Sequence, residues 1–197
     1  MLALAHTGIT LGTTALIAGA VTASSRHSRQ RIQLPASSAV DGASSRMISL
    51  TNLLDVRFLL VGALLSDIID KPLGLLLFDN GRVFGHTLLF LVLITGAGFY
   101  LYRWRKKSWL FILSLGTFMH LILDQMWQTP QTLLWPLFGL AFPREEPADW
   151  IPSILHALTK PEVYLPELAG AVILLWFAWI LIKRRKVFYF IRRGQVE

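Results

Sequence analysis

Histidine and aspartate side chains near the ends of long apolar segments are the residues of this chain that could do chemistry. His120 and Asp124 are four positions apart at the end of one apolar run. Asp67 and Asp70 are three positions apart at the end of another. Residues with these spacings share one face of a helix, so each pair can converge on one centre. Because imidazoles and carboxylates are ligands of zinc and manganese, the spacing predicts a divalent metal site.

Two further histidines complete the predicted site. His6 lies in the first apolar segment of the chain, and His86 begins a later one. The predicted metal ligands are His6, Asp67, Asp70, His86, His120 and Asp124. The chain contains no cysteine, and a site that lacks thiolate and retains water is typical of hydrolytic chemistry. We expect zinc, or alternatively manganese, with Asp67 or Asp70 as the general base.

Each of these residues also has a simpler interpretation. His6 alone would be an interfacial histidine, and Asp67 and Asp70 alone would end a helix among the lipid head groups. His120 and Asp124 are harder to explain in this way, because apolar residues flank them. A central aspartate in a transmembrane helix costs about 2.5 to 3.5 kcal/mol, so ionisable groups there usually face a partner and mark function. Together the six residues favour a metal site.

The composition predicts that this site belongs to a membrane protein. Of the 197 residues, 54% are hydrophobic and 16% are charged, and the mean hydropathy is +0.53. Ordinary soluble domains carry about 25% charged residues. We therefore predict an all-α, polytopic membrane protein with one integral membrane domain over residues 1–197.

Five segments are apolar enough to be transmembrane helices of about 20 residues each. They cover residues 3–23, 50–70, 84–102, 108–127 and 165–182. The serine- and arginine-rich residues 24–47 are expected to be a flexible loop. Six prolines exclude a continuous span in residues 128–164 and indicate an irregular cap. Residues 183–197 are expected to form a basic tail.

The positive charges predict the orientation of these spans, because cytoplasmic flanks accumulate Lys and Arg. Fourteen of the 19 Lys and Arg residues fall on one side of the predicted membrane and four on the other. The fourteen are Arg26, Arg29, Arg31, Arg46, Arg103, Arg105, Lys106, Lys107, Lys183, Arg184, Arg185, Lys186, Arg192 and Arg193. We therefore expect a multi-pass protein of the cytoplasmic membrane with its N-terminus outside and its C-terminus inside.

This orientation brings all six predicted ligands to the extracytoplasmic end of the spans. It also explains the basic pI of about 10.1 without a nucleic-acid partner. The four outer cations are Lys71, Arg82, Arg144 and Lys160. Lys71 and Arg82 flank the predicted site, where they would either hold a substrate phosphate or pair with Asp79 or Asp67.

Four sequence segments carry a resemblance to a known family. They are GALLSDIIDKPL (62–73), NGRVFGHTLL (80–89), HLILD (120–124) and LWPLFG (134–139). Together with His6, they resemble the YdjM-like family of membrane-bound metal-dependent hydrolases. The resemblance implies a metal centre at membrane level, built from an N-terminal His, an Asp-rich helix end, a His-Ser/Thr motif and an HxxxD helix. These motifs map onto His6, Asp67 with Asp70, His86-Thr87, and His120 with Asp124.

The second motif departs from the family pattern. Many members look like DxDH at this position, whereas the chain reads Asp67-Ile68-Ile69-Asp70-Lys71. The order of the histidines and aspartates is also similar to that in zinc-dependent phospholipase C and the S1/P1 nucleases. Those enzymes cleave phosphodiesters with clustered zinc, and the similarity implies the class of reaction.

The main hypothesis is a membrane hydrolase that cleaves a phosphoester of a lipid or lipid-linked substrate. Arg82 and Lys71 would hold the phosphate, while the metal polarises a phosphoryl oxygen. The alternative is a non-catalytic membrane scaffold or regulator with a structural metal. A transporter is less consistent with the pattern, because it requires ionisable groups through the full membrane depth. The sequence predicts no oligomeric state.

The predicted orientation can be tested with reporter fusions. A reporter fused after Glu197 should behave as cytoplasmic and one inserted near Pro147 as extracytoplasmic. The reason is that most Lys and Arg residues fall on the side of the membrane that carries the C-terminus. Alkaline phosphatase activity, which requires export, measures the two locations. The reverse pattern would place the site at the cytosolic face and contradict a substrate that enters from the outer leaflet.

Overall fold

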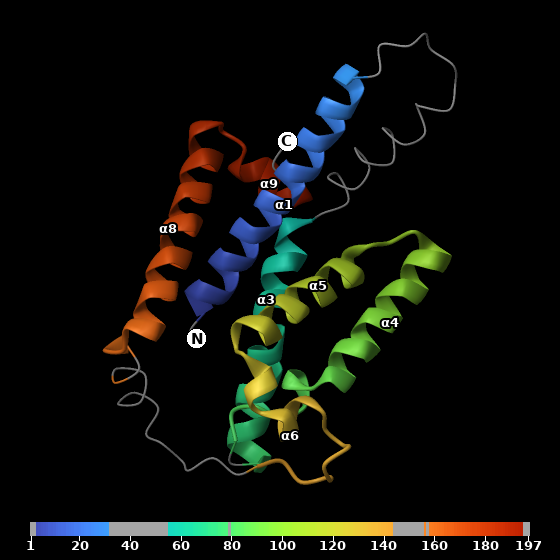
Figure 1. Cartoon of the computed structure of the whole chain (residues 1–197), viewed down its shortest axis with the longest axis vertical. Helices are drawn as coiled ribbons and strands as arrows, with labels where there is room; N and C mark the ends of the chain where they lie inside the picture. The colour runs from blue at the N-terminus through green and yellow to red at the C-terminus, as the bar shows by residue number, and fades with distance from the viewer. Residues whose placement is uncertain (1–2, 32–54, 79, 144–155, 157, 195–197) are drawn as a thin grey trace.

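The computed structural model describes residues 3–31, 55–78, 80–143, 156 and 158–194, and this part of the chain consists of helices and turns (Figure 1). The long helices are α1 (Ala3–Arg31), α3 (Val56–Leu73), α4 (Leu88–Arg105), α5 (Trp109–Leu123) and α8 (Pro161–Lys183). The short elements are η1 (Gly74–Phe78), η2 (Phe84–His86), η3 (Met126–Gln128), α6 (Pro130–Leu133) and α9 (Val187–Arg193). The predicted all-α fold is confirmed.

Each of the five predicted spans overlaps one long helix. Among the described helices, only α8 is both long and apolar enough to cross a membrane by itself, with a mean hydropathy of 2.1. Two shorter apolar helical stretches are Ala3–Ile17 of α1 and the whole of α5. In Figure 1, α8 and α4 lie on opposite sides of the molecule, with α1, α3 and α5 between them.

Two elements differ from the sequence-based expectation. Helix α1 continues to Arg31, although a loop was expected from Ser24. Arg and Gln are good helix formers, so an existing helix propagates through them at little cost. In the expected tail, α9 forms a helix whose end contacts the start of α3, where Val56 N–H donates to the Gly194 carbonyl at 2.9 Å. The rest of the predicted loop, residues 32–47, and residues 144–155 of the predicted cap lie outside the described residues.

Glycines allow α5 to cross close to α3. A Cβ on Gly116 of α5 would overlap the backbone of Leu59, and a Cβ on Gly62 of α3 would overlap the backbone of Leu113. The Thr117 hydroxyl lies in the same contact, 3.3 Å from the Gly62 carbonyl oxygen. Small residues permit this close approach because no side chain separates the two backbones. The crossing brings the C-terminal half of α5 against α3.

A second close contact joins α1 to α8. Gly8 and Gly170 face each other so closely that a Cβ on either would overlap the backbone of the other helix. Below them, one Glu167 carboxylate oxygen accepts from the N–H groups of Leu4 and Ala5 at 3.2 and 3.3 Å. The first N–H groups of a helix have no partner within it, and a carboxylate suits this positive end. Glu167 therefore anchors the first turn of α1.

The close crossing of α3 and α5 can be tested with two matched glycine substitutions. Gly116→Ala should lower the free energy of unfolding by about 1 to 3 kcal/mol, because the added methyl meets backbone rather than a mobile side chain. Gly96 in α4 has open space around it, so Gly96→Ala should leave stability unchanged or raise it by about 1 kcal/mol. Thermal unfolding in detergent measures both. Equal effects of the two variants would contradict the close crossing.

Candidate metal centre

Side chains from four elements meet at one buried point between α1, α3, η2 and α5. They are His6 of α1, Asp67 of α3, His86 of η2, His120 of α5 and Asp124 at the C-terminal cap of α5. The three histidines are fully buried. The aspartate side chains are nearly so, with 14% of Asp67 and 5% of Asp124 exposed. Residues more than 100 positions apart in the chain thus form one cluster.

Asp70 fixes the orientation of His86. Its buried carboxylate accepts from the backbone N–H groups of Val83, Gly85 and His86 at 2.8, 2.6 and 3.1 Å. The same carboxylate lies 2.6 Å from Nδ1 of the His86 ring. Because an ionised carboxylate only accepts hydrogen bonds, Nδ1 carries a proton. In the neutral ring, Nε2 then directs a lone pair toward the centre.

A glycine lets this loop approach α3. A Cβ on Gly85 would lie 2.9 Å from the Asp70 carboxylate and 3.0 Å from the Ser66 carbonyl oxygen, which is tighter than side chains normally pack. The absence of a side chain at Gly85 therefore allows the backbone N–H groups of residues 83–86 to reach the carboxylate. Hydrogen bonds to the Asp70 carboxylate therefore hold residues 83–86, which precede α4, against α3.

His120 is oriented in the same manner by a backbone carbonyl. Its Nδ1 lies 2.7 Å from the Ala63 carbonyl oxygen, which only accepts, so Nδ1 carries the proton and Nε2 the lone pair. The Nε2 atoms of His120 and His86 are 3.2 Å apart. Two lone pairs at this distance repel each other unless a proton or a metal ion lies beside both. Two nitrogen ligands of a tetrahedral zinc ion, each at 2.0 to 2.1 Å, are about 3.3 Å apart.

Two carboxylates face the imidazole pair. Asp67 Oδ1 lies 3.7 Å from His86 Nε2 and 3.9 Å from His120 Nε2. Asp124 Oδ2 lies 3.6 and 3.9 Å from the same two nitrogens. The second oxygen of Asp124 lies 2.9 Å from His6 Nε2. The donor set of imidazoles and carboxylates therefore fits a divalent ion such as zinc.

The donors form two overlapping groups. His6, His120 and Asp124 offer atoms within 4.8 Å of one another, and so do Asp67, His86 and His120. Both groups contain His120, whose Nδ1 is already bonded to the Ala63 carbonyl. Since only Nε2 of His120 is free to ligate, it can bind one ion and not two. The two groups therefore share one donor, which a single ion would take.

Asp67 and Asp70 look equivalent in the sequence, but the structure places them differently. Asp67 faces the centre, whereas both oxygens of Asp70 are occupied by donors behind His86. The two flanking cations each contact a carboxylate of the cluster. Lys71 Nζ lies 2.8 Å from the second oxygen of Asp67, and Arg82 Nε lies 3.5 Å from Asp124 Oδ2. Asp79, the other partner considered for these cations, lies outside the described residues.

Two supporting groups were not identified from the sequence. Backbone carbonyls such as that of Ala63 leave no signal in residue type, so the anchor of His120 could not be found. Asn80 holds the loop before His86, since its side-chain oxygen accepts from Arg82 N–H at 2.7 Å and its amide donates to the Pro143 carbonyl. The Asn80-Gly81 pair signals a turn, but it does not show what the asparagine side chain contacts.

The role of Asp70 in orienting His86 can be tested by substitution with asparagine. Asp70→Asn keeps the shape but removes the charge that holds the proton on His86 Nδ1, so zinc affinity should fall about 10- to 100-fold. Competition with a chelator measures the affinity. Asp55→Asn at the other end of α3 is the matched control and should leave affinity unchanged. Equal affinities for Asp70→Asn and the wild type would contradict this role.

Comparison with protein families gives a match over most of the chain. The family model described as YdjM inner membrane protein matches residues 1–187, a range that contains every residue of the cluster. No curated protein and no solved structure matches the chain significantly. The family match agrees with the resemblance carried by the four sequence segments and by His6. The chain therefore belongs to the YdjM inner membrane protein family.

Proposed function

We propose that this protein is a membrane-embedded, metal-dependent hydrolase that cleaves a phosphoester of a lipid or lipid-linked substrate. The observation that carries the proposal is the 3.2 Å distance between Nε2 of His86 and Nε2 of His120, in rings whose other nitrogen is already bonded. Two carboxylates beside this pair complete a donor set for a divalent ion. Zinc is the proposed ion, and manganese is the alternative.

In this proposal, α1, α3, α4, α5 and α8 all cross the membrane, and the centre lies at its extracytoplasmic end. The family description as an inner membrane protein supports a membrane location. Large apolar side chains on the outer helices support it as well. Val92 and Phe99 of α4 are 58% and 64% exposed, and Leu175 of α8 is 70% exposed. Apolar surfaces of this kind require a lipid or protein partner.

The proposed ligands are His86, His120, Asp67 and Asp124, with His6 as a further ligand or as the hydrogen-bond partner of Asp124. A divalent ion held there would act as a Lewis acid on a phosphoryl oxygen and lower the pKa of a water molecule. Burial of the histidines in apolar helices excludes bulk water, which strengthens every electrostatic interaction at the centre.

The surrounding residues have distinct proposed roles. Asp67 is a ligand rather than a free base, because one of its oxygens faces the centre and the other is held by Lys71. Asp70 is a positioning residue, since donors occupy both of its oxygens. Arg82 lies at the rim beside Asp124, with 37% of its side chain exposed. Its guanidinium is therefore placed to bind a phosphate that approaches from solvent or from the lipid head groups.

The alternative function is a membrane scaffold whose metal only ties helices together. The complete burial of His6, His86 and His120 favours this alternative, because structural metal sites are closed to solvent. Metal content is the same under both proposals, so turnover must separate them.

Metal binding can be tested by removing one proposed ligand. His120→Ala should abolish bound metal and leave the protein inserted in the membrane, because α4 and α5 keep their apolar faces. Elemental analysis of detergent-purified protein measures the metal content. His156→Ala is the matched control, since His156 is exposed and outside the cluster, and it should retain full occupancy. Unchanged occupancy in His120→Ala would assign that histidine a purely structural role.

Catalysis can be tested with two further variants on any phosphoester lipid that the wild type cleaves. Asp124→Asn removes a negative charge from the centre, so kcat/KM should fall about 100-fold or more and metal should bind more weakly. Arg82→Ala should instead raise KM about tenfold, with the metal retained, because phosphate binding is lost.

Lys160→Ala is the control for loss of an exposed cation predicted on the same side of the membrane, and it should leave both constants unchanged. Wild-type hydrolysis in both Asp124→Asn and Arg82→Ala would disprove the proposed active site and favour the scaffold.

A further inference from the structure

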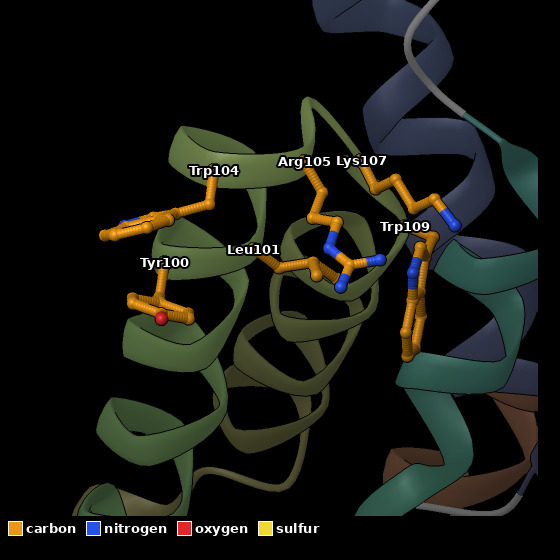
Figure 2. A pocket seen from close by; sticks show the side chains of 6 residues that line it. All are labelled: Tyr100, Leu101, Trp104, Arg105, Lys107 and Trp109. Carbon is orange, nitrogen blue, oxygen red and sulfur yellow. The ribbon is translucent and has the colours of Figure 1, made fainter.

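A pocket lies at the turn between α4 and α5, at the opposite end of these helices from the metal centre. Its lining residues are Tyr100, Leu101, Trp104, Arg105, Lys107 and Trp109, and its volume is about 440 Å³ (Figure 2). Pockets for small ligands typically measure about 300 to 1,000 Å³. None of these residues takes part in the proposed hydrolase, and no residue of the metal centre lines the pocket.

The pocket is positively charged. Figure 2 shows the side chains of Arg105 and Lys107 extending from the turn toward Trp109. Among the described residues, neither cation forms an ion pair with a carboxylate, in contrast to Lys71 and Arg82 at the metal centre. Trp109 is the first residue of α5, so the positive end of that helix also lies at the pocket.

The geometry of the turn separates the cations. Lys106 ends α4 in a left-handed conformation with φ of 55°, and its N–H bonds to the Tyr102 carbonyl. Its ammonium group lies 5.7 Å from the centre of the Tyr102 ring, which is not part of the pocket lining. The neighbouring positions, Arg105 and Lys107, both line the pocket. The turn therefore places the side chains of Arg105 and Lys107 at the pocket and directs that of Lys106 away from it.

Aromatic side chains give the pocket the character of a membrane interface. The rings of Tyr100 and Trp104 pack with their centres 5.5 Å apart, and Trp104 is 74% exposed. Trp109 closes the other wall, and Leu101 supplies an apolar surface. Trp and Tyr concentrate where head groups meet acyl chains, so this combination fits a ligand with a charged head and an apolar tail.

We infer that this pocket binds the phosphate of an anionic phospholipid head group in the cytoplasmic leaflet. Within the described part of the chain, these two cations have no carboxylate partner, and together with the positive end of α5 and three aromatic rings they match such a ligand in charge and polarity. Basic pockets between membrane helices on the cytoplasmic side are known to bind anionic lipid head groups. The inference rests on the proposed membrane orientation and is independent of metal binding and hydrolysis.

Native mass spectrometry of the full-length protein with phosphatidylglycerol tests this inference. The double variant Arg105→Gln/Lys107→Gln should bind the lipid about 30-fold more weakly than the wild type, since each cation near an anionic head group contributes roughly a fivefold effect. The matched control Arg103→Gln/Lys106→Gln removes the same charge from the same turn and should change affinity less than about threefold. Equal losses in the two variants would show non-specific attraction and overturn the inference.

Further arms separate the lipid from other ligands and from misfolding. Phosphatidylcholine should bind the wild type and the Arg105→Gln/Lys107→Gln variant equally weakly. The charge-conserving variant Arg105→Lys/Lys107→Arg should recover most of the phosphatidylglycerol binding. Displacement of the lipid by millimolar inorganic phosphate would identify free phosphate as the ligand and overturn the lipid assignment. Failure of the charge-conserving variant to bind phosphatidylglycerol would show that positive charge at these two positions does not hold the lipid, and would overturn the inference.

Discussion

The buried carboxylate of Asp70 is the interaction on which the rest of the site depends. It collects three backbone N–H groups and one imidazole N–H from residues 83–86, in a place where none of them could be satisfied by water. A hydrogen bond to a charged group contributes about 1.5 to 3 kcal/mol, and an unsatisfied buried donor costs a similar amount. The carboxylate therefore holds the part of the loop between α3 and α4 that carries His86. It also keeps a proton on Nδ1 of His86.

The helix crossings add a second constraint of a different kind. His120 can donate to the Ala63 carbonyl only because α5 approaches α3 through Gly116 and Gly62, where side chains would hold the helices apart. The N-terminal turn of α1, which carries His6, is fixed in turn by Glu167. The donors of the candidate centre are thus placed by backbone contacts between helices, and a substitution at these glycines would move candidate ligands that it does not touch.

The sequence predicts the elements better than it predicts the roles of individual residues. The apolar segments were sufficient to predict an all-α chain. The spacing of His120 and Asp124 was sufficient to predict a cluster of histidine and aspartate. The difference between Asp67 and Asp70 was not predictable, because both share one helix face and only the loop of residues 83–86 decides which is occupied by donors. The extension of α1 likewise depends on propagation of an existing helix, and α9 contacts the start of α3. Residue type alone reveals neither.

In the proposed hydrolase, the exposure of the cluster sets the path by which a substrate would reach it. The three imidazole rings are fully buried, while exposure rises through the carboxylate of Asp67 to the side chains of Arg82 and Lys71, which are 37% and 43% exposed. Within the described part of the chain, a phosphate would meet these two cations before it met any imidazole. Each cation is also paired with a carboxylate of the centre, so an arriving phosphate competes for the same guanidinium or ammonium group. Binding of the phosphate would therefore weaken the ion pair between Arg82 and Asp124 or the one between Lys71 and Asp67. Recognition of the phosphate would in this way change the charge balance of the carboxylates at the centre.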